Sequence, residues 1–272
     1  MPLPFEGTGL TVQARLEGVS VKGTVMGEEE SVDSEVGMEN VLAHLLSPDD
    51  ERSREEPEIA QNIGTQLQHM GLSTWSISII RRLRDALGRL KPQSILEVGA
   101  GIGHRSAWLY DLFETDSSTP DRYQLVEDGA KFAVIIRRLM LRHDAESYTS
   151  IVVGNLDALI GETNAWHAAS STGVEVGKPP LEIQHDAIIV DGKSETRGRS
   201  VQALLPFLST SGVLFTVEPD MPLGNIEEDD VEGMKLVDGF NQWMECIQAT
   251  TVTHHIAFMP LFGGTLVAIA KK

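Results

Sequence analysis

A glycine-rich segment carries the clearest chemical signal in the sequence. It reads Glu97-Val98-Gly99-Ala100-Gly101-Ile102-Gly103 and begins at the end of a short apolar run. Glycine tolerates the positive φ of a sharp turn and lets backbone N–H groups approach a ligand closely. A helical pattern begins near Arg105, so the N–H groups of its first turn would face the same point and favour an anionic group. The segment therefore predicts a ligand-binding loop between a strand and a helix.

The spacing within this loop narrows the class of ligand. The glycines follow Gly-x-Gly-x-Gly, and His104 stands where a dinucleotide-binding helix would place its third glycine. Glu97 lies two residues before the first glycine, where its carboxylate can accept a hydrogen bond from the loop or from an ammonium group. These features argue against a nicotinamide dinucleotide.

Polar residues also follow the next two apolar runs. Glu127 and Asp128 end the second run, where a carboxylate can accept both hydroxyls of a ribose. Asn155, Leu156 and Asp157 end the third run, where polar groups can contact an adenine edge. Acids for an ammonium group and a ribose, a helix end for a carboxylate and polar groups for adenine together predict S-adenosylmethionine as the cofactor.

Apolar runs and helical patterns alternate from about residue 59 onward. A first helix is expected over residues 75–87, capped by Ser73 or Thr74 and ended by Gly88. Strands are expected at 94–98, 123–126, 150–153, 187–190 and 213–217, followed in turn by helices at 105–113, 130–142, 157–168, 196–208 and 234–247. Such alternation predicts a parallel sheet covered on both faces. The last two strands, 252–258 and 266–270, are too close for a helix between them and must form an antiparallel pair.

From about Gly71 to Lys272 the chain resembles the class I methyltransferases, in particular the small-molecule O-methyltransferases related to catechol and caffeoyl-CoA O-methyltransferases. The resemblance is carried by the glycine loop, by Glu127, by the fourth-strand segment 185–193 and by the closing hairpin 258–268. It implies an α/β fold with a doubly wound, mostly parallel, seven-stranded, Rossmann-like sheet and a reversed C-terminal β-hairpin. It also implies S-adenosylmethionine-dependent methylation of a small molecule, most simply at oxygen.

The resemblance assigns roles to individual residues. Asp191 would lie beside the sulfonium and the acceptor, with Lys193 as the base, although Lys193 follows Asp191 by two residues where the family has three. Arg105 or Ser106 would bind the carboxylate of the cofactor in place of the family's serine. The expected cofactor-binding residues are Glu97, Gly99, Ala100, Gly101, Gly103, Arg105, Ser106, Glu127, Asp128, Asn155, Leu156, Asp157 and Asp191.

A site for magnesium or another divalent cation is a further implication of the resemblance. The family places an aspartate at the fourth strand and an Asp-Asn pair at the fifth. Asp191 is present, but the fifth strand ends in Val217-Glu218-Pro219-Asp220, and the proline has no side-chain oxygen. Asp191, Glu218 and Asp220 are the expected ligands of such a site.

The composition limits the expected partners and compartment. A net charge of −18 disfavours nucleic acid as the main partner, because such a surface repels phosphate groups. One local basic cluster, interpreted as a solvated helix face, comprises Arg81, Arg82, Arg84, Arg89 and Lys91. No apolar run is long enough for a membrane span, the first residues lack a signal-peptide pattern, and the single cysteine, Cys246, precludes an intrachain disulfide. A cytoplasmic protein is expected.

Two regions are expected along the chain. Residues 1–58 form an N-terminal extension with a β-hairpin at 9–27, an acidic linker and a short helix at 38–46, and residues 59–272 form the cofactor-binding domain. The connection 161–182 is interpreted as a surface loop and His185 as a surface residue. The sequence leaves open whether the chain forms a homodimer.

Methylation of a small-molecule acceptor is the favoured function. The alternative is a non-catalytic S-adenosylmethionine-binding or scaffold protein with a degenerate active site, because the metal and base positions depart from the family's pattern. A nicotinamide-linked oxidoreductase is opposed by His104 and by the reversed hairpin.

Overall fold

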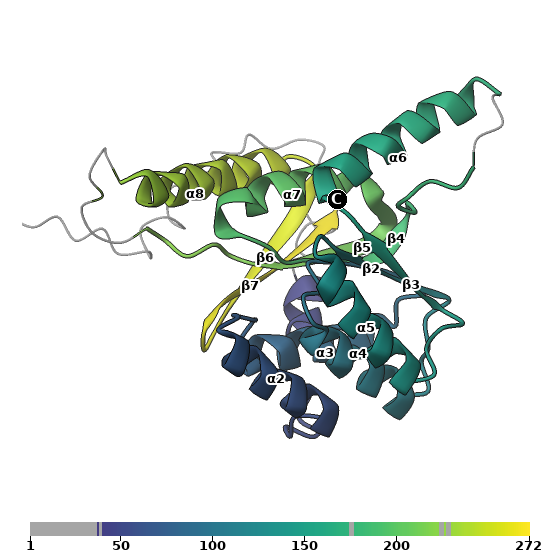
Figure 1. Cartoon of the computed structure of the whole chain (residues 1–272). Coiled ribbons are helices and arrows are strands. Elements are labelled where there is room, and N and C mark those ends of the chain that lie inside the picture. The colour runs from purple at the N-terminus through teal and green to yellow at the C-terminus, as the bar shows by residue number, and fades with distance from the viewer. Residues whose placement is uncertain (1–36, 38–39, 174–176, 223–225, 227–229) are drawn as a thin grey trace, which may run out of the picture.

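The fold is built on one seven-stranded sheet in the order β3-β2-β1-β4-β5-β7-β6 (Figure 1). The computed structural model describes residues 37, 40–173, 177–222, 226 and 230–272. Its strands are β1 (Ser94–Val98), β2 (Arg122–Glu127), β3 (Thr149–Val153), β4 (His185–Val190), β5 (Leu208–Val217), β6 (His254–Leu261) and β7 (Gly264–Lys271). Strands β1 to β5 pair in parallel, and β7 runs antiparallel between β5 and β6. The predicted fold class is confirmed.

Helices cover both faces of this sheet. In Figure 1, α2 to α5 lie below it and α6 to α8 lie above it. The helices are α2 (Glu58–Met70), α3 (Ile77–Leu90), α4 (His104–Thr115), α5 (Ala130–Arg142), α6 (Leu156–Ser171), α7 (Arg197–Leu204) and α8 (Val231–Thr250), with 3₁₀ turns at Ser194–Thr196 and Leu205–Phe207.

The strands divide their side chains between two hydrophobic cores. Successive residues of a strand point to opposite faces of the sheet. Ile95 and Ile189 therefore pack into the core that contains α3 and α4, whereas Leu96 and Ile188 pack into the core that contains α7 and α8. All five residues of β1 are buried, and Ile95, Leu96 and Val98 supply its apolar side chains to both faces.

Helix α3 begins later and ends later than the sequence predicted. Ser76, rather than Ser73 or Thr74, is its N-cap, and its side chain accepts a hydrogen bond from the backbone N–H of Ile79. The helix continues through Gly88, where a Cβ would lie 2.6 Å from Nη2 of Arg52. Gly88 therefore does not end the helix. It gives Arg52 room to cross it and reach Asp116 in an ion pair.

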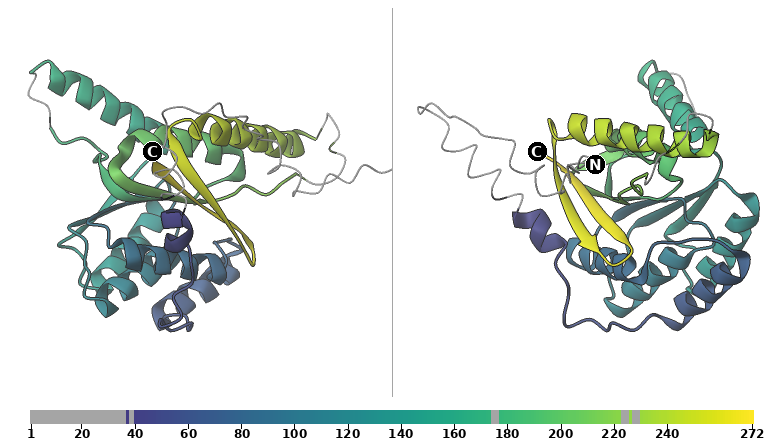
Figure 2. Two further views of the ribbon diagram at one scale, coloured as in Figure 1. Left: turned by 180° about the vertical axis from the view of Figure 1, so that it is seen from behind. Right: turned by 90° about the vertical axis from the view of Figure 1, so that its left-hand side faces the viewer.

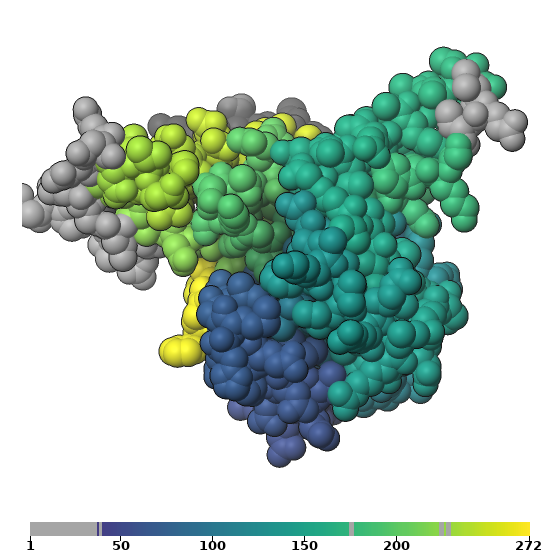
Figure 3. Space-filling model, in the orientation of Figure 1, coloured from purple at the N-terminus to yellow at the C-terminus, as the bar shows by residue number. Residues whose placement is uncertain are grey.

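Helix α6 occupies part of the connection that was interpreted as a surface loop. It continues to Ser171, and its buried residues, Leu159, Ile160 and Thr163, all lie in its first half. Its far end projects from the body of the molecule (Figures 1 and 3). Helix α2, for which the sequence analysis predicted no element, buries only Ala60, Ile63 and Leu67.

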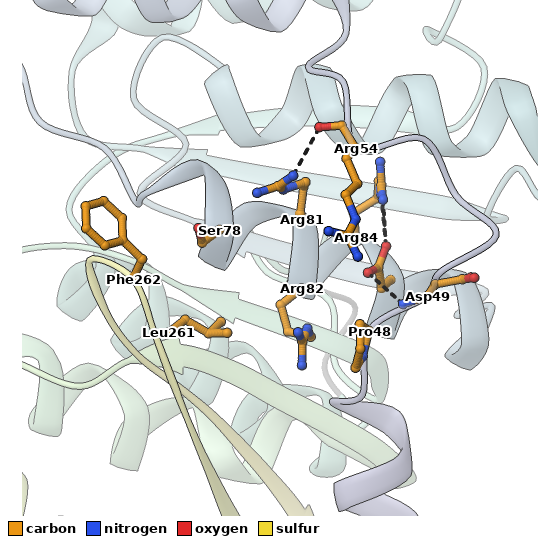
Figure 4. Close-up of a pocket in the computed structure, with 10 residues that line it drawn as sticks. Pro48, Asp49, Arg54, Ser78, Arg81, Arg82, Arg84, Leu261 and Phe262 are labelled. Carbon is orange, nitrogen blue, oxygen red and sulfur yellow. Dashed lines mark hydrogen bonds and ion pairs between the residues drawn. The ribbon is translucent and has the colours of Figure 1, made fainter.

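The arginines of α3 hold the segment before α2 against the domain. They donate hydrogen bonds to the backbone carbonyls of Leu45, Leu46, Ser47, Pro48, Ser53 and Arg54. Arg84 is 6% exposed and also pairs with Asp85. The interpretation of this cluster as a solvated helix face is wrong for these arginines, because their donors satisfy backbone carbonyls within residues 45–54. A pocket of about 310 Å³ remains between this segment, α3 and the tip of the β6–β7 hairpin (Figure 4).

The closing hairpin extends along one edge of the sheet (Figure 2). Ser76 donates a hydrogen bond to the carbonyl of Phe262 at the hairpin tip, at 2.6 Å, which joins the tip to the start of α3. The β-hairpin expected at residues 9–27 lies outside the described residues. Within the part of the chain that the structure describes, no helix has the length and apolar character of a membrane span.

Candidate active site

The glycine loop lies between β1 and α4 and has the backbone conformation that requires glycine. Gly99, Gly101 and Gly103 have φ values of 75°, 60° and 87°. A Cβ on Gly99 would lie 2.7 Å from the backbone oxygen of Asp191, so the ends of β1 and β4 approach too closely for any side chain. A Cβ on Gly101 would meet no atom within 4 Å. The loop is therefore fixed on its β4 side and open at its middle glycine.

Glu127 at the end of β2 anchors this loop. Its Oε2 accepts a hydrogen bond from the N–H of Gly101 at 2.7 Å, and its Oε1 accepts one from the N–H of Gly129 at 3.0 Å. Each carboxylate oxygen can accept more than one hydrogen bond. Glu127 can therefore hold the loop and still accept donors from a ligand.

Glu97 is completely buried beneath the loop. Its Oε2 accepts hydrogen bonds from the hydroxyls of Ser106, at 3.0 Å, and Tyr123. Burial and the Glu97 carboxylate raise the pKa of Tyr123, which keeps this phenol protonated as a donor. Ser106, expected to bind the carboxylate of the cofactor, is itself fully buried and orients Glu97 instead.

Arg105 lies at the centre of the site and is 3% exposed. It forms an ion pair with Asp191, donates to the carbonyl of Gly99 at 2.6 Å, and its Nη2 lies 3.3 Å from Oε1 of Glu97. Its Cζ lies 4.6 Å from the ring centroid of Trp75, a cation–π contact. Burial lowers the pKa of Arg105, but Asp191 and Glu97 outweigh it and the net shift is upward.

Asp191 follows the last residue of β4 and faces two arginines. Besides Arg105, Nη2 of Arg197 lies 3.4 Å from its Oδ1, which also accepts a hydrogen bond from the N–H of Gly192 at 2.7 Å. Burial raises the pKa of Asp191, but the two arginines overcome this and the net shift is downward. The carboxylate is thus held as an anion beside the glycine loop.

The residues expected to contact the adenine, after β3, make fewer contacts with the rest of the site. Oδ1 of Asn155 caps α6 by accepting hydrogen bonds from the N–H groups of Asp157 and Ala158 at 3.1 and 3.3 Å. Leu156 is half-buried, and Asp157 and Asp128 are exposed. The side-chain oxygen of Asn155 is therefore committed to its own helix, and its amide nitrogen is the group left to contact a ligand.

Solved structures with the same arrangement of elements are known, although no family model and no curated protein matches the chain. A methyltransferase from Podospora anserina bound to SAH is similar with a TM-score of 0.56 at 16% identity, over 93% of this chain and 100% of that one. An O-methyltransferase from Bacillus cereus in complex with SAH gives 0.53 at 15% identity, over 88% of this chain and 100% of that one. The O-methyltransferase TomG from Streptomyces achromogenes, in complex with SAM, gives 0.57 at 15% identity, over 91% and 100%.

This chain has the class I methyltransferase fold. The reversed β6–β7 hairpin completes the seven-stranded sheet, and the glycine loop joins β1 to α4 at the carboxyl end of the parallel strands. In a doubly wound sheet, ligands bind at this end, where the strand order reverses. In this class I fold the reversal lies between β1 and β4, next to Gly99 and Asp191.

The three residues expected to bind a metal do not form a site in this class I fold. Among the described residues, no group of three His, Cys, Asp or Glu side chains is placed to hold an ion. Glu218 is half-buried, Asp220 is exposed, and both oxygens of Asp191 are already occupied. The prediction of a site from Asp191, Glu218 and Asp220 is therefore not supported, because arginines neutralise the central carboxylate.

The candidate bases differ in their surroundings. Lys193 is exposed and directly precedes the 3₁₀ turn Ser194–Thr196, and the described residues show no ion pair to its ammonium group. His104 is buried, and its Nε2 and Nδ1 lie 2.8 Å from Glu56 and 3.4 Å from Thr74. Burial lowers the pKa of His104, only partly offset by Glu56. Of these two side chains, Lys193 is the one free to reach an acceptor.

Two residues were misjudged or missed by the sequence analysis. His185 is completely buried, not at the surface, and its ring lies 2.9 Å from both Ser94 Oγ and the carbonyl of Glu182. Arg197 was not singled out, because an arginine in the first turn of a helix gives no signal of burial.

Proposed function

We propose that this chain is an S-adenosylmethionine-dependent methyltransferase that methylates an oxygen of a small molecule. The observation that carries this proposal is the convergence of Glu97, Arg105 and Asp191 beside a glycine loop anchored by Glu127. These groups come from the ends of β1, β2 and β4 and from the first turn of α4, which is the ligand-binding edge of this fold.

The site contains polar atoms that a methionine moiety would satisfy. Nε of Arg105 is buried and has no hydrogen-bond partner among the described residues, and buried Oε1 of Glu97 has only its ion-pair contact with Arg105. Buried polar groups are rarely left unsatisfied without a functional reason. Glu97 and the carbonyl of Gly99 would accept from the ammonium group, and Arg105 would bind the carboxylate. Glu127 would accept from the ribose hydroxyls, and the open side of Gly101 leaves room beside the loop.

The bound cofactor would supply a methyl group activated by its sulfonium. In such a transfer the C–S bond would break with its electron pair kept by sulfur, a C–O bond would form, and the acceptor proton would pass to a base. The protein then contributes mainly position and charge. Asp191 would provide an anion next to the sulfonium, and Lys193 is the side chain proposed to accept the proton.

The solved neighbours support a small acceptor. The Streptomyces O-methyltransferase is involved in tomaymycin synthesis, and its structure contains SAM. The acidic charge of the chain and its single cysteine also favour a cytoplasmic enzyme with a small-molecule acceptor over a nucleic-acid partner.

Calorimetry on the full chain tests the cofactor. We expect saturable binding of S-adenosylmethionine and S-adenosylhomocysteine and no binding of NAD, the control ligand. Absence of binding by both sulfur compounds would overturn the proposal.

A turnover assay tests whether the protein transfers the methyl group to an oxygen. The enzyme is incubated with S-adenosylmethionine and a panel of phenols, carboxylic acids and amines, and S-adenosylhomocysteine is measured. Formation that depends on a hydroxyl-bearing acceptor supports the proposal. Binding without turnover across the panel supports the alternative, a non-catalytic S-adenosylmethionine-binding protein.

A further inference from the structure

Arg197 crosses the ends of two neighbouring strands. Its Nη1 donates a hydrogen bond to the carbonyl of Val217 at 2.9 Å, and its Nη2 donates to the carbonyl of Gly192 and contacts Asp191. The residue is 8% exposed, and its buried Nε has no acceptor among the described residues. Arg197 is therefore a buried, fixed positive charge with an N–H still available.

The guanidinium lies where the resemblance implied a divalent cation. The expected ligands were Asp191, after β4, and Glu218 and Asp220, after β5. Arg197 spans the same two strand ends. Burial and the nearby charge of Arg105 lower the pKa of Arg197, and the charges of Asp191 and Asp220 offset this only in part.

The ligand set that remains suits an arginine better than a metal ion. Mg²⁺ demands near-octahedral coordination by oxygen atoms. Asp191 already accepts hydrogen bonds at both oxygens, and Pro219 contributes no side-chain oxygen. An arginine needs only acceptors arranged about its plane, and the carbonyls of Gly192 and Val217 provide them.

We propose that Arg197 takes the place of the divalent cation and supplies a covalently fixed positive charge beside the reacting acceptor oxygen. This inference rests on the proposed methyltransferase function. A cation at this position stabilises the negative charge that develops when a hydroxyl loses its proton. Methyl transfer in this enzyme then requires no added divalent ion.

Manganese binding tests the inference without an acceptor. The full chain is dialysed against EDTA and titrated with Mn²⁺, with free ion followed by electron paramagnetic resonance. We expect no saturable site at micromolar Mn²⁺, with or without S-adenosylhomocysteine. One saturable site in the wild type that Asp191→Asn abolishes would overturn the inference and leave the proposed function intact.

A matched pair of variants tests the role of the charge. Arg199 is exposed on the same helix, so Arg199→Gln serves as the control for Arg197→Gln. We expect Arg197→Gln to keep its affinity for S-adenosylmethionine and to lose on the order of 10² in kcat, the typical effect of removing an electrostatic stabiliser. Its pH–rate profile should also move to higher pH, since the acceptor hydroxyl ionises less readily. A purely structural role would not move this profile.

Each remaining outcome has a defined meaning. If Arg197→Gln does not fold, Arg197→Lys keeps the charge and should retain more activity than Arg197→Met, measured on the same acceptor. Wild-type turnover that EDTA abolishes and Mg²⁺ restores contradicts the inference. Absence of S-adenosylmethionine binding by the wild type contradicts the proposed function instead.

Discussion

Arg105 reaches from the first turn of α4 to Asp191 at the end of β4, and this ion pair connects the glycine loop to the strand beside it. Arg105 is 3% exposed and simultaneously contacts Gly99, Glu97 and Trp75. One side chain thus joins both carboxylates of the site to the loop that would hold the cofactor.

Replacing Arg105 should therefore affect stability as well as binding. Arg105→Met leaves Glu97 and Asp191 without their main counter-charge, and breaking a buried pair from one side costs about 3–5 kcal/mol. Urea unfolding measures this loss, and calorimetry should show no S-adenosylmethionine binding. Arg105→Lys, which keeps the charge but loses the planar contact with Trp75, should be intermediate. Wild-type stability of Arg105→Met would contradict the assignment.

Glu127 should contribute both to the stability of the glycine loop and to cofactor binding. In Glu127→Gln an NH2 group replaces one carboxylate oxygen, so the N–H of either Gly101 or Gly129 loses its acceptor. This loss costs about 1–3 kcal/mol. The ribose would lose an anionic acceptor as well, so affinity should fall by at least about tenfold, or about 1.4 kcal/mol. The exposed Glu146→Gln is the control and should bind as the wild type does. Equal affinity of both variants for S-adenosylmethionine would show that Glu127 does not bind the cofactor.

The glycines of the loop should separate packing from ligand access. Gly99→Ala combines a left-handed φ with a Cβ 2.7 Å from a backbone oxygen, and it should lose more than about 2 kcal/mol of unfolding free energy. Gly101→Ala has φ strain but open space around its Cβ, and should lose about 1 kcal/mol while still weakening cofactor binding. Denaturant unfolding with parallel calorimetry compares the two. A larger stability loss for Gly101→Ala would refute this account of the loop.

Buried His185 should make the protein sensitive to acid. Burial lowers its pKa to about 4, only partly offset by the carbonyl of Glu182. In the unfolded chain this histidine binds a proton near pH 6.5, whereas in the folded state it binds one only near pH 4. Its contribution to the free energy of unfolding is therefore fully present above about pH 6.5 and is lost as the pH decreases toward 4. The expected loss over this window is about 3 kcal/mol.

A difference measurement isolates this histidine from other acid-sensitive groups. Urea unfolding at pH 7.5, 6 and 5 should show a shallower pH dependence for His185→Gln than for the wild type. His44→Gln, at an exposed position, should leave the dependence unchanged. Parallel curves for all three proteins would show that His185 does not titrate in this range.

Much of the fold was predictable because it is encoded locally. Short, mainly apolar segments such as Ser94–Val98, buried on both faces, are typical of strands in a covered sheet, and helical patterns separate them. The short interval before the last strand could only give an antiparallel hairpin. The glycines with positive φ and the carboxylate of Glu127 at the end of β2 were likewise identifiable from residue type and spacing.

What the sequence could not determine depends on contacts between distant residues. Arg105 and Asp191 are 86 positions apart, and nothing in either local pattern indicates that they pair. Glycine is typical of a helix end, yet Gly88 lies within α3, at the point where Arg52 crosses the helix. His185 and Arg197 have polar side chains whose burial depends on which neighbours satisfy them, and only the assembled strands supply those neighbours. Local preferences therefore fixed the order of elements and the loop, whereas the charge pairing that defines the site was decided by the tertiary structure, because burying a charge is favourable only when a partner is held in place.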